Sequence, residues 1–570
     1  MRLASRLSIL GGEMMLRAFL PILLCAAAVP AAAQPHDDHG QAGPPQSLAG
    51  WAKGARLYQG LGSFHRPITT ASPEAQAYFD QGMRFIWAFN HDEATRSFAR
   101  AAEIDPGCAS CWWGVALTLG PNYNMPLMAD ARARAAWEAL QRAQAAAAKA
   151  TPVEQALIGA LAARFLGPKP LDPSNSAAPL KAYVAAMRAV AARFPADMDV
   201  QTLTAEALMN TNPWKLWNAD GTPGPGTPDI LAALKIVLAK DPAHPGANHY
   251  WIHAVEASQH PEQAVASAER LVGMMPAAGH LEHMPAHILQ RVGRYEEAAE
   301  ANRKGAAADL AYLAATAPPD YYPMYLIHNF QFLAFAAAME GRKAETLDAL
   351  RKAKGAVPEA MLLGMPGLDW SVGYLYDGMV RFGMWDALLA EPRPNPKLAG
   401  LTAAWLQARA TALAATGKPD EAEAAVAELD ALVAATPAAA TQGQNPARPL
   451  YEIGALRAKA RIASARGDKA RAVALLTEAV AKEDRIAYDE PEDMFFPSRH
   501  LLGAALLAAG RPAEAEAVYE ADLKRHPHNG WALHGLQAAY EARRKYPGEI
   551  DPQAAQAWAH ADVQTRASAY

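Results

Sequence analysis

The chain has few cysteines, little net charge and almost no runs of β-branched residues. Only 3 of its 570 residues are cysteine, and the length alone excludes a small scaffold stapled by disulfides. Lys and Arg number 53 against 58 Asp and Glu, so the basic surplus on which nucleic-acid binding depends is missing. At 51% hydrophobic residues the chain is too apolar to be disordered. No nucleic acid is therefore expected as a partner.

Alanine is present in nearly every segment of the sequence. It has the highest helix propensity of all residues, and this composition predicts an all-α fold. After residue 33 no segment is both long enough and uncharged enough for the roughly 20 residues of a membrane-spanning helix. The sequence therefore predicts no membrane span.

The first 33 residues have the three parts of a secretory signal peptide. Arg2, Arg6 and Arg17 are followed by an apolar run over residues 18–29 and by small residues at 31–33, where cleavage is expected. Residues 34–65 are expected to form a disordered lead-in. The mature protein is predicted to be periplasmic or secreted.

Cleavage would leave two cysteines, Cys108 and Cys111, in a C-x-x-C pair. In an oxidising compartment such a pair is a disulfide, a redox pair or two metal ligands. A redox pair normally lies at the strand-to-helix turn of a βαβ unit, and the sequence predicts no such unit. The pattern favours a structural disulfide or two buried thiols.

A 34-residue repeat runs through the sequence. In the repeat beginning at residue 75 its small, aromatic and proline positions are Tyr78, Gly82, Phe85, Ala94, Phe98, Ala101 and Pro106. This is the tetratricopeptide (TPR) pattern, in which small residues allow two helices to approach closely and proline ends the second helix. The repeat predicts a right-handed solenoid of stacked helix-turn-helix hairpins.

The repeats divide the mature chain into three parts. Residues 66–240 are predicted to form an N-terminal TPR array with a long loop at 210–228. Residues 241–345 form central, histidine-rich hairpins, and residues 346–570 form a C-terminal array. Within the last part, the acidic turn of Asp489, Glu490, Glu492 and Asp493 is expected to be a solvated loop, with docking of a partner as the alternative.

Histidines recur at equivalent positions of two successive repeats. His249 and His253 take positions 5 and 9 of the repeat from residue 245, and His283 and His287 take the same positions of the next repeat. These positions share one helix face, which is the concave side of such a solenoid. Pro285 is expected to kink the second of these helices or to delay its start. The candidate metal ligands on this strip are His249, His253, Glu256, His280, His283, His287 and His328.

Imidazole and carboxylate groups are ligands for transition-metal ions such as zinc, copper and iron. Packed helices lie about 8 to 10 Å apart, so neighbouring helices can share one ion. The sequence therefore predicts a metal site on the concave face. One alternative is a scaffold whose groove holds a protein or peptide partner while the histidines only pack. A second is a metal-dependent enzyme that uses the same site with a glutamate as base. A third is an anion held by imidazolium and Arg291.

The sequence resembles a large group of exported bacterial TPR proteins. The resemblance rests on residues 89–124, on HPGANHYWIHAVEAS (244–258), on GHLEHMPAHI (279–288) and on YDEPEDMFFPSRHLLGAALL (488–507). It implies the solenoid and the export, and it implies no particular activity. Members of the group often have a histidine where this chain has Gln331, and this departure weakens a ligand role for the helix that carries His328.

Overall fold

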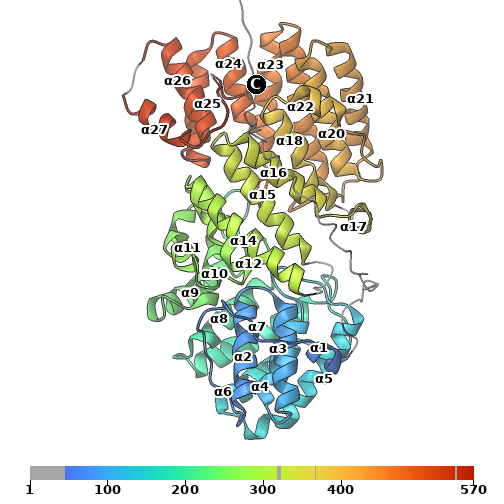
Figure 1. The fold of residues 1–570 in the computed structure, drawn as a ribbon, viewed down its shortest axis with the longest axis vertical. Helices are drawn as coiled ribbons and strands as arrows, with labels where there is room; N and C mark the ends of the chain where they lie inside the picture. Colours follow the sequence, from blue (N-terminus) through green and yellow to red (C-terminus); the bar gives the residue numbers. More distant parts are fainter. Residues whose placement is uncertain (1–44, 46, 317–321, 366, 546–547, 566) are drawn as a thin grey trace, which may run out of the picture. The chain divides into compact units, whose positions relative to one another are not determined.

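The computed structural model describes residues 45 and 47–570, apart from 317–321, 366, 546–547 and 566. The expected signal peptide at residues 1–33 lies outside this part of the chain. The described residues form helices that pack in sequential pairs, with one small two-stranded sheet (Figure 1). The predicted all-α solenoid of TPR type is confirmed.

The N-terminal array contains the helices coloured from blue to green in Figure 1, beginning with a short helix that precedes the first hairpin. Its elements are α1 (Leu48–Ala52), α2 (Pro73–Trp87), α3 (His91–Ile104), α4 (Ala109–Leu119), α5 (Asp130–Ala146), the 3-10 turn η1 (Ala147–Lys149), α6 (Pro152–Ala162), α7 (Ala177–Arg193), α8 (Met198–Met209) and α9 (Thr227–Lys240).

The helix α1 lies in the segment expected to be a disordered lead-in. Ser47 caps this helix by accepting a hydrogen bond from the Gly50 backbone N–H, and Trp51 is fully buried. The guanidinium of Arg132 lies over the Trp51 indole at 5.4 Å from its centroid. The expectation of disorder is therefore wrong from residue 47 onward, because an apolar anchor holds this segment against α3.

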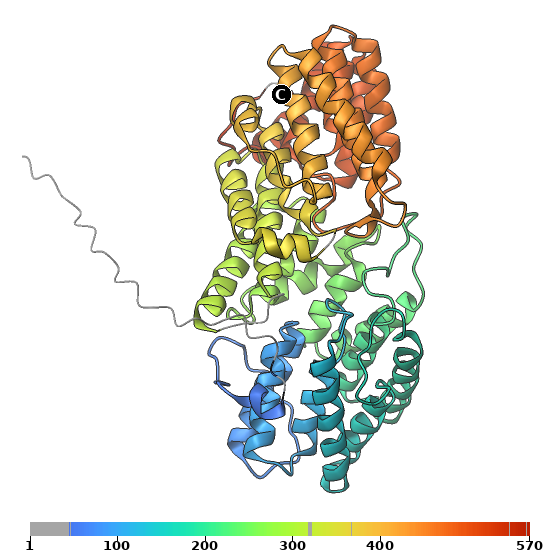
Figure 2. The same ribbon diagram turned by 90° about the vertical axis from the view of Figure 1, so that its right-hand side faces the viewer.

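The central hairpins, green in Figures 1 and 2, follow the predicted repeat with one interruption. Pro285 has no backbone N–H to donate, and the helix that begins at Gly279 is divided at Met284. The elements are α10 (Pro245–Val255), the 3-10 turn η2 (Pro261–Ala264), α11 (Val265–Leu271), α12 (Gly279–His283), α13 (Pro285–Arg291), α14 (Tyr295–Ala315) and α15 (Pro323–Met339).

The C-terminal array contains the remaining helices and the small sheet, and Figure 2 shows its yellow-to-red helices as paired hairpins. Its elements are α16 (Lys343–Gly355), α17 (Glu359–Gly364), η3 (Asp369–Val372), α18 (Tyr374–Arg381), α19 (Trp385–Ala390), α20 (Ala399–Ala415), α21 (Pro419–Ala435), β1 (Thr441–Gln442), β2 (Asn445–Pro446), α22 (Ala447–Ala465), α23 (Lys469–Glu483), α24 (Ser498–Ala508), α25 (Pro512–Arg525), α26 (Gly530–Ala542) and α27 (Ile550–Ala557).

A glycine–aromatic–glycine sandwich explains why the first hairpins pack as they do. A Cβ atom on Gly82 or on Gly114 would lie 2.5 Å from the Phe98 ring. The two glycines therefore let α2 and α4 approach the aromatic side chain of α3 from both sides. Tyr519 of α25 occupies the same place between Gly503 and Gly535 of α24 and α26, where a Cβ would come within 2.3 Å of the ring.

The C-terminal array reaches the central hairpins through the segment 487–493. The side chain of Asn445 holds the start of this segment, accepting from the Ala487 N–H at 2.8 Å and donating to the Ala487 carbonyl at 3.0 Å. The β1–β2 turn contributes a further bond, from the Gln444 N–H to Asp489 at 2.8 Å. This hairpin positions the acidic segment next to α10 and α13.

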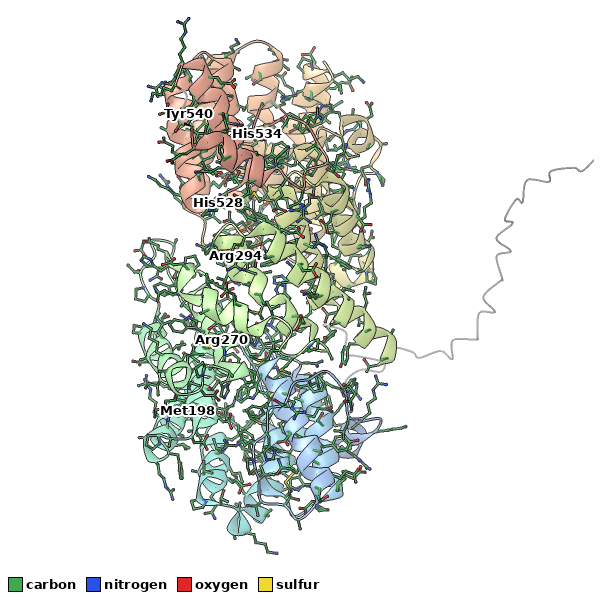
Figure 3. All side chains as sticks on the ribbon, turned by 60° about the vertical axis from the view of Figure 1, so that its left-hand side comes forward. Met198, Arg270, Arg294, His528, His534 and Tyr540 are labelled. Carbon is green, nitrogen blue, oxygen red and sulfur yellow. A yellow bond between two sulfur atoms is a disulfide. The ribbon has the colours of Figure 1, made fainter. Side chains whose placement is uncertain are left out.

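A second contact joins the same two regions at their turns. The turn between α13 and α14 meets the turn between α25 and α26, where Gly293 lies against the Pro527 carbonyl and the His528 ring. Figure 3 labels Arg294 and His528 at this place.

The loop predicted at 210–228 packs over the start of the central region. The indole N–H of Trp217 donates to the Ala254 carbonyl of α10 at 2.8 Å, and Trp217 also pairs with Pro223 in an isolated bridge. Earlier in the array, Cys108 and Cys111 form a disulfide at the start of α4. None of the helices in the described residues combines the length and the apolar character that crossing a membrane requires.

Candidate metal centre

Three histidines from α10 and α12 form the first ligand group, called triad A: His249, His253 and His280. Each can offer a ring nitrogen, and these nitrogens lie within 4.8 Å of one another. His249 and His253 are one helical turn apart on α10, and α12 brings His280 alongside them. All three are at most 5% exposed, so they lie inside the molecule and not on an open groove.

Hydrogen bonds at Nδ1 orient two members of triad A. The Nδ1 of His249 bonds to the Trp87 carbonyl at 2.6 Å, and the Nδ1 of His253 bonds to Oε1 of Glu256 at 2.8 Å. The close approach of α2 to α10 depends on Gly246, whose Cβ would lie 2.3 Å from the Trp87 ring. Both Nε2 atoms, and both ring nitrogens of His280, have no hydrogen-bond partner among the described residues.

Phe89 closes one side of triad A. It adopts a left-handed backbone conformation (φ 53°) in the turn between α2 and α3, which is uncommon for a bulky residue. Its ring centroid lies 4.4 Å from that of His249, and the ring stacks on His253 and His280 at 5.7 Å each. The Phe89 ring therefore covers one side of the three imidazoles.

The second ligand group, triad B, consists of His283, His287 and His328. These side chains come from α12, α13 and α15, and their ligand atoms also lie within 4.8 Å of one another. The Nε2 atoms of His283 and His287 are 2.7 Å apart. The Phe332 ring packs against all three imidazoles at centroid distances of 4.6 to 4.8 Å.

Asn302 of α14 fixes the orientation of His283. Its amide N–H donates to the Ala298 carbonyl at 2.7 Å, so its Oδ1 accepts the Nδ1–H of His283 at 2.6 Å. The Nε2 of His283 then carries no hydrogen and accepts from His287. One proton therefore lies between two nitrogens that are oriented like ligands of a common ion.

Two carboxylates lie between the triads and border both of them. Glu256 contacts His253 through Oε1, and its Oε2 lies 2.6 Å from Nδ1 of His287. Oε2 of Glu490 lies 3.1 Å from the same Nδ1. His253, Glu256 and Glu490 form a third group whose ligand atoms lie within 4.8 Å.

The two triads are neighbours. The ring centroids of His253 and His287 are 5.6 Å apart, and those of His280 and His283 are 5.9 Å apart. Because all members except His328 are buried, the two groups form one continuous cluster of imidazoles.

Burial controls the protonation of most of these histidines. It lowers the pKa of His249, His280 and His283 well below the usual range, and that of His328 to about 3. These rings are therefore neutral near pH 7, and neutral imidazole is the form that binds metal ions.

The exception is His287. Burial opposes its charge, but the carboxylates of Glu490 and Glu256 outweigh burial and raise its pKa to about 10. The same pairing acts on Glu256: burial favours its neutral form, yet His287 and His253 hold the pKa well below the usual range. Burial and the charge of Glu256 raise the pKa of Glu490 to about 8.

A cavity of 170 Å³ borders the cluster. His253, His328, Glu256 and Glu490 face it, and the rest of its wall includes Tyr123, Trp214, Gln444 and Tyr488. Trp214 and Gln444 also line a larger cleft of 780 Å³ that contains residues of the 210–228 loop. The smaller cavity is therefore bordered by both carboxylates and by one histidine of each triad.

All seven residues predicted from the sequence lie in this cluster, and their role as ligands stays a prediction. Glu490 was not predicted as a ligand. The acidic turn that contains it is half-buried and its side chains are paired, so the expectation of a solvated loop is wrong: Glu490 contacts His287 and Glu492 contacts His526. The acidic composition and the likeness of residues 488–507 to exported TPR proteins singled out this segment, but neither indicated a contact with the histidines.

Two further expectations concern side chains near the cluster. Gln331 donates to the Ser371 carbonyl at 2.6 Å and has no part in the triads, although His328 on the same helix does. Arg291 donates to the backbone carbonyls of Glu256 and Ser258 and lies over the Tyr488 ring. It therefore fixes the end of α10, and its guanidinium is already used by these contacts.

Comparison with protein families and with curated proteins finds no match to this chain. Solved structures with similar folds are TPR-repeat proteins. The Cut9–Hcn1 hetero-tetramer of the APC/C is 13% identical with a TM-score of 0.31, covering 82% of this chain and 76% of that chain. The human IFIT1 dimer with m7Gppp-AAAA is 12% identical with a TM-score of 0.30, covering 87% and 92%. Yeast Tom70 is 10% identical with a TM-score of 0.28, covering 85% and 93%. The likeness extends to the helical-repeat fold alone.

Proposed function

We propose that this protein is an exported TPR solenoid that binds transition-metal ions through triad A and triad B. The observation that carries the proposal is the set of unpartnered nitrogens in triad A. A buried ring nitrogen without a hydrogen bond costs about 1 to 3 kcal/mol. His249, His253 and His280 together have four such nitrogens within the described residues. A metal ion between them would satisfy three at once.

The hydrogen bonds at Nδ1 support the same conclusion. Metal-binding histidines usually donate their second ring N–H to a carboxylate or a carbonyl oxygen, which fixes the ring and raises its basicity as a ligand. In this chain the acceptors are the Trp87 carbonyl, Glu256 and Asn302. The bonds leave Nε2 of His283 facing Nε2 of His287, and they leave Nε2 of His249 and of His253 without a partner among the described residues.

The donor set favours zinc, copper or iron. Imidazole ligands suit these ions, whereas calcium and magnesium prefer oxygen ligands. Glu256 and Glu490 add carboxylates at the edge of both triads, and carboxylates are accepted by zinc and iron in mixed sites.

Export outside the cytoplasm is part of the proposal. The Cys108–Cys111 disulfide supports it, because disulfides persist in the periplasm and outside the cell but are rare in the cytosol. The charged, apolar and small-residue segments of residues 1–33 have the order of a secretory signal. Accumulation of the protein in the periplasmic or extracellular fraction of expressing bacteria would be the corresponding measurement.

Elemental analysis tests the metal proposal. Protein purified without a polyhistidine tag should contain at least one transition-metal ion per chain. His253→Ala and His287→Ala should reduce the content, because each removes a ligand from one triad. His260→Ala is the matched control, since this histidine is exposed and lies outside the triads.

Asn302→Leu supplies a second test that leaves every ligand in place. Loss of the acceptor at Nδ1 of His283 should weaken metal binding about 10- to 100-fold. A folded wild-type protein that takes up no zinc, copper or iron would contradict the proposal and leave an interaction scaffold. Equal metal content in the wild type, His253→Ala and His287→Ala would contradict it as well.

One observation favours a catalytic use of the site. The 170 Å³ cavity places Glu256 and Glu490 at the edge of the triads, where a metal-bound water could be deprotonated by a carboxylate. A panel of ester, phosphate and peptide substrates, assayed before and after removal of the metal, distinguishes an enzyme from a metal-binding protein.

A further inference from the structure

A second cavity, of 220 Å³, lies in the C-terminal array and is separate from the histidine cluster. Its wall comes from α18, α19, α20, α22, α23 and α24, from Phe496 and from the last residues of the chain. Three arginines face it: Arg381, Arg457 and Arg461. Arg381 and Arg457 are buried, and Arg461 is partly exposed.

The two buried guanidinium groups have no carboxylate within ion-pair distance among the described residues. Arg381 donates to the Ser568 carbonyl at 3.2 Å and to Nδ1 of His500 at 2.9 Å, and its Nε has no hydrogen-bond partner in the residues that the structure describes. Within the described part of the chain, Arg457 donates only to the Met494 sulfur at 3.6 Å, and its Nη2 has no partner. Arg461 donates to the backbone oxygen of Tyr570 at 3.1 Å.

Asp377 and Glu483 attract the charge of Arg457, but their carboxylates make hydrogen bonds with other groups. Asp377 accepts from the Gln407 amide at 2.7 Å, and Glu483 accepts from the Ser498 N–H at 3.1 Å. Burial lowers the pKa of Arg381, Arg457 and Arg461, because no neighbouring charge fully offsets the loss of water. The charges of Asp522, Asp377 and Glu483 offset burial only in part, so an anion in the cavity would be attracted by these guanidinium groups.

Much of the remaining wall is aromatic or aliphatic, with Gln407, Thr411 and Ser464 as polar members. The Phe496 ring lies under both buried guanidinium groups, 5.1 Å from Arg381 and 4.1 Å from Arg457. Ala504, Ala505 and Leu501 add aliphatic surface, while Ser464 and Ala508 are exposed at the mouth. A site of this kind combines a cationic end with an aromatic and aliphatic end.

We propose that this cavity binds a small organic anion, a carboxylate attached to an apolar or aromatic body. The carboxylate would accept hydrogen bonds from Arg457 and Arg461, with the charge of Arg381 behind them. The body would pack against Phe496 and the alanines of α24. Arginine is suited to this task because its planar N–H groups match both oxygens of a carboxylate.

Isothermal titration with benzoate tests the proposal, and benzamide serves as the uncharged analogue of the same shape. We expect saturable binding of one benzoate per chain and no binding of benzamide. Arg457→Gln and Arg461→Gln should each weaken benzoate binding about tenfold or more, which is the effect of losing one charge-assisted hydrogen bond. Arg471→Gln, at an exposed arginine of the same array, is the matched control and should bind like the wild type.

Circular dichroism identifies variants that fail to fold. Arg461 is partly exposed, so Arg461→Gln carries the test if the buried Arg457→Gln unfolds. Repeating the titration with His287→Ala separates this site from benzoate bound to a metal ion in the histidine cluster. Absence of benzoate binding, equal binding of benzamide, or unchanged affinity in Arg461→Gln would each overturn the proposal.

Discussion

Two buried histidines, His280 and His500, differ in how their ring nitrogens are satisfied. His500 bonds to Asp522 at 2.7 Å through Nε2 and accepts from Arg381 at 2.9 Å through Nδ1. This is a histidine with a structural role, because both nitrogens are used within the chain. Neither nitrogen of His280 has a partner among the described residues, although the ring lies between Phe89, Tyr325 and three other histidines. The contrast separates a packing residue from a candidate ligand.

The C-terminal array also contains a histidine with a strong pH dependence. His526 lies 3.1 Å from Asp522 through Nδ1 and 3.1 Å from Glu492 through Nε2. Burial opposes its charge, but the two carboxylates raise its pKa from 6.5 to about 9. The charged ring therefore stabilises the folded protein fully below pH about 6.5, and this stabilisation is lost as the pH rises through about 9.

Thermal unfolding followed between pH 6 and 9.5 measures the stabilisation by the charged His526 ring. We expect the Tm of the wild type to fall across this range, with a loss of stability of order 3 kcal/mol at most. His526→Gln should flatten the dependence, since the neutral amide does not titrate. His534→Gln, at a half-buried histidine without a carboxylate partner in the described residues, should keep the wild-type profile. A wild-type Tm that is constant or that rises over this range would contradict the prediction.

At the scale of helices, a short glycine–aromatic–glycine unit sets the packing of hairpins near both ends of the solenoid. Gly82 and Gly114 lie sixteen residues before and after Phe98, and Gly503 and Gly535 have the same spacing around Tyr519. The glycines are needed because any Cβ would overlap the ring. The unit therefore explains why small and aromatic residues alternate in the 34-residue pattern.

Substitution of these glycines should be costly, although alanine is the better helix former. Gly82→Ala places a Cβ 2.5 Å from the Phe98 ring and should destabilise the protein by about 1 to 3 kcal/mol. Gly159→Ala in α6 has no neighbour within 4 Å and should stabilise it by up to about 1 kcal/mol. Thermal unfolding measures both. Gly82→Ala combined with Phe98→Leu should lose less than the sum of the single changes, and strict additivity would show that the ring is not the cause.

The 34-residue period explains which residues of the candidate site could be predicted from the sequence. His249, His253, His283 and His287 were found because they occupy equivalent repeat positions, and a period places them on adjacent helices. Glu490 could not be found in this way, because it follows α23 in a segment outside the repeat and reaches His287 only through the folding of the chain. The β1–β2 hairpin gave no signal either, since its strands are two residues long.

At the scale of the whole described chain, the candidate metal centre joins segments that are far apart in sequence. Its side chains come from α10, α12, α13 and α15 and from the acidic segment that follows α23. The acidic segment is in turn held by the β1–β2 hairpin through Asn445 and Gln444. A metal ion bound to the triads would therefore tie the central hairpins to part of the C-terminal array.

Hydrogen exchange with and without metal measures this connection. Removal of the ion by a chelator should speed amide exchange in α10 to α13, because the triads would lose their common partner. Exchange should also rise in residues 487–491 and 441–446, since Glu490 contacts His287 and the hairpin holds the same segment. Peptides of α21 serve as the control, because this helix contributes nothing to the cluster. If exchange becomes faster only in α10 to α13, the acidic segment is held independently of the ion. If exchange is unchanged everywhere, the ion does not organise these helices and the prediction is wrong.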